Sequence, residues 1–175
     1  MENDSEREVE LKRKFWKELD RSPFMMLGLQ GVEDSRTRPM TAKVDIPDGA
    51  DPEDGGQIYF FGSKSEHLVL GLASHHRAVA TFASKDHDLF AHVHGTLVID
   101  NDRAVIDRLW GPSVASWYEK GKDDPDLVLL RFDTEQADIW EADPGAMFKA
   151  AMIKLAGRDP GEHHTKKHSA EVILS

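Results

Sequence analysis

The sequence contains no cysteine and has few basic residues for its length. Without cysteine there is no disulfide, no thiolate nucleophile and no cysteine-ligated zinc. Lys and Arg number 22 against 32 Asp and Glu, which gives a formal net charge of −10. Because so acidic a chain is repelled by nucleic acid and by anionic membrane surfaces, we expect neither as a partner.

Long apolar runs are also missing. No window reaches the about 18 consecutive apolar residues that indicate a transmembrane helix. Residues 1–16 are mostly charged, unlike a secretory signal peptide. Together with the absence of disulfides, these features lead us to expect a cytoplasmic protein. The length of 175 residues predicts one domain with a sizeable core.

Short strand-like segments dominate what is present. The patterns predict strands at 24–31, 36–46, 57–61, 77–84, 89–100, 126–133 and 136–142, the last two joined by a tight turn at Thr134–Glu135. They predict helices at 5–20, 64–73, 101–111, 113–121 and 144–157. Strands and helices do not alternate strictly, which favours an antiparallel sheet closed or nearly closed into a small barrel. We place the domain at 1–156 and expect 157–175 to be a polar, disordered tail.

The turn after the third predicted strand reads Gly62-Ser63-Lys64-Ser65. Ser63 and Glu66 have the spacing of a capping box, and a helix N-terminus binds anions through free backbone N–H groups. A phosphate site with Lys64 as the charge is one interpretation. The other is an ordinary helix cap with a solvated lysine.

Three cations, Arg36, Arg38 and Lys43, lie on one predicted strand. Arg38 suits a bidentate contact to phosphate. Lys43 falls on the opposite strand face unless the strand bulges, and Pro39 favours a bulge. The alternative is a solvated edge strand with protective charges.

His92 and His94 lie two apart on the clearest strand, so both point to one face. Two such histidines can share a metal if His87 or His67 adds a third ligand. The alternative is that they are surface or interface residues. We assign no site to the histidines at 163, 164 and 168.

The tryptophans divide by their neighbours. We expect Trp16 and Trp117 in the core, as is common for this residue. Trp140 lies among polar residues on the last predicted strand, which indicates contact with something flat or with a partner subunit.

The order of five segments resembles the general stress protein branch of the pyridoxamine 5'-phosphate oxidase-like, flavin-binding split barrels. These segments are FWKELDRSPFMMLGLQG, RTRPMTAKV, IYFFGSKSEHLV, FAHVHGTLVIDNDRAVIDRLW and WYEKGKDDPDLVLLRFDTEQADIWEA. The resemblance covers about residues 10–155. It implies a mainly β (α+β) fold, an antiparallel Greek-key split barrel with peripheral helices. It also implies a homodimer with FMN, or alternatively FAD, at two interface sites.

The resemblance further implies roles for single residues. Arg38 and Lys43 would meet the flavin phosphate, with Ser63 and Lys64 reaching it from the next strand end. The ring would be contacted by the backbone of Pro39, Met40 and Thr41, by the side chains of Phe60 and Phe61, and by Trp140 of the partner subunit. Relatives commonly have Thr where this chain has Gly62, so one hydroxyl is lost.

The activity that follows from the resemblance is a flavin-dependent redox role in stress, with an unnamed small-molecule redox partner. The C-terminal Arg/His segment that the true oxidases use for their substrate has no match, so we do not expect oxidation of pyridoxamine phosphate. No residue is identified as a catalytic acid or base, and turnover stays open. Two alternatives remain: a flavin-binding or sensing protein without turnover, and a metal-binding barrel using His87, His92 and His94.

Overall fold

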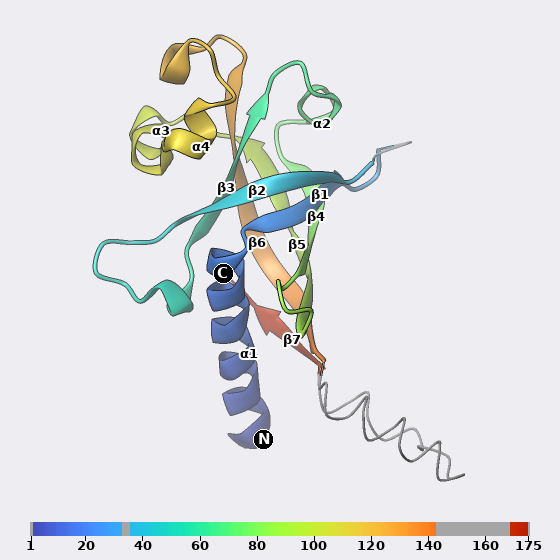
Figure 1. The fold of residues 1–175 in the computed structure, drawn as a ribbon. Helices are drawn as coiled ribbons and strands as arrows, with labels where there is room; N and C mark the ends of the chain where they lie inside the picture. The colour runs from blue at the N-terminus through green and yellow to red at the C-terminus, as the bar shows by residue number, and fades with distance from the viewer. Residues whose placement is uncertain (1, 33–35, 143–168, 175) are drawn as a thin grey trace.

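The computed structural model describes residues 2–32, 36–142 and 169–174 (Figure 1). The helix predicted at 144–157 and the histidines at 163, 164 and 168 lie outside the described residues. The strands are β1 (Phe24–Leu29), β2 (Arg38–Asp45), β3 (Gln57–Ser63), β4 (His76–Ala83), β5 (Leu89–Ile99), β6 (Leu127–Glu141) and β7 (Ser169–Ile173).

These strands form one antiparallel sheet in the order β3-β2-β1-β4-β5-β6-β7, and a further pairing of β3 with β6 closes β1 to β6 into a barrel. The neighbours β4-β1-β2-β3 form a Greek key, because the fourth strand returns beside the first. The helices are α1 (Glu2–Arg21), α2 (His67–Leu70), α3 (Arg103–Leu109) and α4 (Pro112–Ala115), with 3-10 turns η1 (Pro52–Asp54) and η2 (Gly121–Asp123). The predicted mainly β, antiparallel Greek-key barrel with peripheral helices is confirmed.

Helix α1 packs against one end of the barrel (Figure 1). Its apolar stripe is fully buried in the barrel core and comprises Leu11, Phe15, Trp16 and Leu19. The Trp16 ring covers Gly55, which has φ 90°, and a Cβ atom there would overlap the ring. A positive φ and a close approach therefore both require glycine at this position.

Ion pairs fix α1 to the ends of β5 and β6. The Lys14 ammonium lies 2.6 Å from the Glu141 carboxylate and 3.0 Å from that of Asp88. Arg7 forms a second ion pair with Glu141. The helix is thus held by apolar packing and by partly shielded charge pairs.

Helices α3 and α4 cover the outward face of β3 and of the first half of β6. The cluster between them comprises Tyr59, Val105, Ile106, Val114, Tyr118, Leu127 and Leu129. Asp102 caps α3, because its carboxylate accepts from the N–H of Ala104 at 2.8 Å. This cover leaves the outward faces of β1, β4 and β5 as the open side of the barrel.

The prediction of a tight turn at Thr134–Glu135 is wrong, because β6 is one continuous strand. Its pairing with β5 shifts from His94↔Gln136 to Gly95↔Thr134, so Glu135 is the extra residue of a β-bulge. Gly95 faces the bulge, where a Cβ atom would overlap the Asp133 carbonyl oxygen. A polar pair that looked like a turn therefore bends a strand.

Three further predictions need correction. Ser63 ends β3 instead of capping a helix, and α2 starts at His67 without a side-chain hydrogen bond at its cap. Residues 169–173 form β7 against β6, so the prediction of a disordered tail is wrong for them. Trp117 is 83% exposed and not in the core, whereas Trp16 is 2% exposed, as predicted.

Candidate functional site

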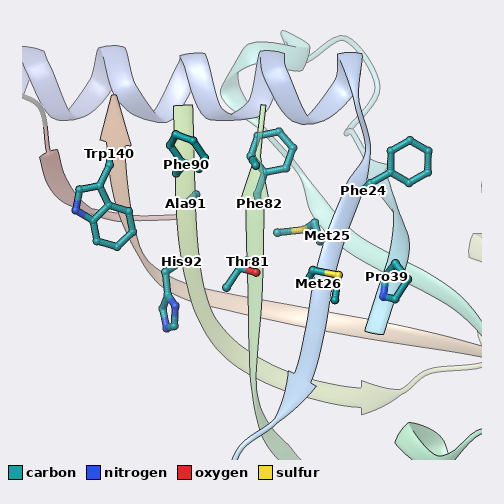
Figure 2. Close-up of a pocket in the computed structure, with 11 residues that line it drawn as sticks. Phe24, Met25, Met26, Pro39, Thr81, Phe82, Phe90, Ala91, His92 and Trp140 are labelled. Atoms are coloured by element: carbon teal, nitrogen blue, oxygen red, sulfur yellow. The ribbon is translucent and has the colours of Figure 1, made fainter. Parts of the chain in front are cut away.

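A groove of about 460 Å³ crosses the open outer face of the barrel (Figure 2). Strand register explains it, because Phe90 pairs with Trp140 and Met26 pairs with both Pro39 and Thr81. Cross-strand partners point to the same face of the sheet. Two neighbouring rows of side chains therefore cross this face, one through Phe90 and Trp140 and one through Pro39, Met26 and Thr81.

Large apolar side chains in these two rows meet solvent. Phe24 is 62% exposed, Trp140 45%, and Met26 and Phe90 39% each. Figure 2 shows Phe90 and Trp140 toward one end of the groove and Phe24 and Pro39 toward the other. A contiguous apolar surface on a folded chain indicates a binding face.

The β2 end of the groove leads to a polar region. Arg38 precedes Pro39, and its guanidinium lies 3.4 Å from the Glu66 carboxylate. This contact places Arg38 beside the turn that follows β3. In that turn the Ser63 and Ser65 hydroxyls are 2.8 Å apart, and both residues donate to the carboxylate of Asp126.

Negative charge surrounds this turn. The Tyr118 hydroxyl donates to the carbonyl of Gly62 at 2.7 Å. Burial raises the pKa of Tyr118 to about 12, and the carboxylates of Glu66, Asp126 and Asp124 contribute to the increase. The predicted cations Arg38 and Lys64 therefore share their surroundings with three acids.

Gly62 does not remove a hydroxyl from this region. A Cβ atom at Gly62 would lie 3.5 Å from a methyl group of Val128 and 3.8 Å from Leu130 and Val69. A threonine at this position would thus place its side chain in the apolar interior. The glycine is compatible with an intact polar turn.

Lys43 does not join Arg38. Strand β2 pairs with β1 and β3 without a register shift, so the predicted bulge is absent. The two side chains lie on opposite faces, and a rise of about 3.3 Å per residue separates their Cα atoms by about 16 Å. Lys43 is opposite Tyr59 on β3.

The remaining predicted residues divide by face. Phe60 is 0% exposed and packs on Phe132, which leaves it no surface for the predicted contact with a ring. Phe61 points outward but packs edge-on against Trp110 at 5.8 Å. Met40 is buried, so it offers its backbone alone, while Thr41 is exposed opposite Phe24.

The metal interpretation lacks ligands. The His92 and His94 rings are 4.5 Å apart, and His87 adopts φ 56° in the turn before β5. Across residues 2–32, 36–142 and 169–174, no group of three or more His, Cys, Asp or Glu is placed to hold a metal ion.

Sequence reasoning missed one side of the groove. Phe24 and Met26 lie in an apolar run predicted as a buried strand, yet β1 starts with alternating exposed and buried residues. Their exposure depends on what covers the sheet, which the run does not show. Phe90 and His92 alternate with buried residues along β5 and so point outward, but nothing in the sequence linked them to Pro39.

The model of the family described as "Pyridoxamine 5'-phosphate oxidase like" matches residues 10–159. The chain belongs to this family. A general stress family protein of Xanthomonas campestris pv. campestris is 50% identical, with a TM-score of 0.69 over 77% of this family member and 88% of that chain. The general stress FMN/FAD binding protein of Xanthomonas citri is 48% identical, with a TM-score of 0.69 over 77% of this chain and 90% of that chain.

Among curated proteins, general stress protein 26 of Bacillus subtilis (strain 168) is 28% identical over 92 residues. That match covers 51% of this chain and 65% of the relative, just under two thirds of its length. None of the helices in the described part of the chain is long and apolar enough to cross a membrane.

Proposed function

We propose that this chain binds a flavin nucleotide, FMN or FAD, in the outer-face groove and has a flavin-dependent redox role in stress. The observation that carries the proposal is the exposed apolar groove, which reaches β2 at Pro39. Pro39 lines the groove, and its neighbour Arg38 reaches the turn at Ser63–Ser65. The relative from Xanthomonas citri named as an FMN/FAD binding protein supports the same ligand class.

The residues present fit such a ligand. The groove volume of about 460 Å³ lies within the range of about 300–1,000 Å³ for small-molecule sites. Phe90 and Trp140 offer flat apolar surface to a ring. Arg38 and the two serine hydroxyls offer donors to a phosphate, with Lys64 exposed next to them.

A bound flavin supplies the electron and hydride transfer chemistry. The chain binds and orients it, and the apolar side chains keep water from one face of the ring. Among the residues that line the groove, His92 alone has an imidazole, a side chain that can both donate and accept a proton. We therefore assign to His92 the holding or delivery of a proton. A non-catalytic flavin-binding protein is the second candidate, because His92 has no second acid or base beside it in the groove lining.

We also propose that a second copy of the chain covers the groove and that the dimer is cytoplasmic. The exposed apolar side chains between Phe24 and Trp140 form a surface that association would remove from water. A stable interface buries about 800 Å² per partner. In this arrangement the flavin lies between the copies, and Trp140 lies in the covered groove beside it.

The visible spectrum and the mass of the cofactor that co-purifies test this function. We expect the absorbance of an oxidised flavin and a mass of FMN or FAD. The variant Arg38→Ala/Lys64→Ala is expected to lose affinity, because both cations lie at the phosphate end. Unchanged affinity would show that the phosphate binds elsewhere, and a chain that takes up neither nucleotide would refute the function. Flavin-dependent NAD(P)H oxidation then separates turnover from binding alone.

A further inference from the structure

Two carboxylates of this chain already bind the donor groups that a phosphate would use. Arg38 is paired with Glu66 at 3.4 Å. Asp126 accepts from the Ser63 hydroxyl and, at 3.3 Å, from the backbone N–H of Ser65. Two of the donors assigned above to the phosphate, Arg38 and the Ser63 hydroxyl, therefore already have an anionic partner in the free chain.

The backbone of Asp126 is also fixed by hydrogen bonds. The Lys64 N–H donates to the Asp126 carbonyl at 2.8 Å, and the Asp126 N–H donates to the Asp124 carboxylate at 3.0 Å. These bonds fix the start of β6 beside the turn after β3. The position of Asp126 is thus set by the closure of the barrel and not by a mobile side chain alone.

We propose that Glu66 and Asp126 are internal competitors of the flavin phosphate and set the affinity of the site for phosphorylated ligands. This inference rests on the proposed function. Binding a phosphate exchanges the Arg38–Glu66 pair and the serine–Asp126 bonds for bonds to phosphate oxygens. The two carboxylates then remain close to a dianion, so each lowers its affinity by like-charge repulsion.

The exchange predicts selectivity as well as weakness. A flavin without a phosphate, riboflavin, has no group that competes with Glu66 or Asp126. Removing either carboxylate is therefore expected to improve binding of FMN and not of riboflavin. A change in net charge alone would improve the binding of any anion, wherever on the surface the substitution lies. A substitution far from the site measures this effect.

The experiment compares dissociation constants of FMN and riboflavin, from quenching of flavin fluorescence, for the full chain and four variants. Three variants are Glu66→Gln, Asp126→Asn and the double substitution. The fourth is Asp48→Asn, which removes the same charge from an exposed position in the loop between β2 and β3. We expect each of Glu66→Gln and Asp126→Asn to bind FMN at least about fivefold more tightly, since unit charges about 4 Å apart interact by about 1 kcal/mol even in water. Riboflavin binding and the Asp48→Asn variant are expected to stay unchanged.

The possible results separate the two proposals. If the parent chain binds FMN and no variant binds it more tightly, the competition is refuted and the flavin function stands. An equal gain for riboflavin, or the same gain in Asp48→Asn, also refutes the competition. If the parent and all variants bind neither flavin, the proposed function falls and this inference falls with it.

Discussion

The aromatic pair at the end of β3 offers a direct test of which side chain faces the interior. Phe60 is 0% exposed and packs on the Phe132 ring with centroids 6.3 Å apart. Phe60→Ala removes a whole buried ring and leaves a cavity, which costs about 3–5 kcal/mol. Domains unfold with about 5–15 kcal/mol, so the variant loses a large part of its stability. At about 2–4 °C per kcal/mol for this chain length, the midpoint of thermal unfolding falls by about 6–20 °C.

Phe61→Ala is the matched control, because it removes the same ring from the outward face, where Phe61 is half-buried against Trp110. We expect a loss of about 1–2 kcal/mol from its partial burial. Both free energies come from urea unfolding followed by circular dichroism, with flavin affinity measured on Phe60→Leu. An unfolding midpoint within about 2 °C of the parent for Phe60→Ala would refute the inward placement. Loss of flavin affinity in a stable Phe60→Leu would instead return Phe60 to the cofactor site.

Three further predictions concern association, pH and the bulge. Trp140→Ser is expected to shift the proposed dimer toward monomer in sedimentation equilibrium, whereas Ile173→Ser, which is more exposed but lies outside the groove, is not; an unchanged Trp140→Ser dimer would contradict the proposed interface. The Ser84 hydroxyl and Lys14 lower the pKa of Asp88, and hydrogen bonds from Lys14 and Arg7 outweigh burial to lower the pKa of Glu141. The stability that both carboxylates contribute is fully present above their ordinary pKa values of 3.8 and 4.5, and it is lost as the pH falls through their lowered pKa values. We therefore measure urea unfolding midpoints at pH 7 and below pH 4. The decrease between the two is expected to be smaller in Lys14→Met than in the parent chain. Gly95→Val is expected to cost about 1–3 kcal/mol in urea unfolding because its side chain overlaps the Asp133 carbonyl, and a cost near zero would mean that the bulge relaxes.

Local pattern was sufficient to predict most of the strands and the barrel class. Alternation along β5 placed His92 and His94 on one face of the strand, and Trp16 was correctly expected in the core. These features depend on periodicities of two and 3.6 residues, which a sequence contains in full. The family resemblance added the Greek-key arrangement of the strands.

The predictions that were wrong concern features set by contacts between residues far apart in the chain. The polar pair Thr134–Glu135 looks like a turn until Gly95 on β5 is placed opposite it. Phe60 and Phe61 are adjacent aromatics, so alternation does not decide which faces inward, and the pairing of β3 with β2 and β6 does. Asp126 meets Ser63 only because β6 closes on β3.

Strand β6 uses one edge twice. Its first half pairs with β3 at 127–132, and its second half pairs with β7 at 136–140. Without β7, the backbone groups of 136–140 would form an open sheet edge next to the exposed Trp140. An unpaired edge beside apolar surface is a template for adding strands from other molecules. Strand β7 thus covers this edge, and a version shortened before residue 169 is expected to aggregate through pairing of the exposed β6 edges of different molecules.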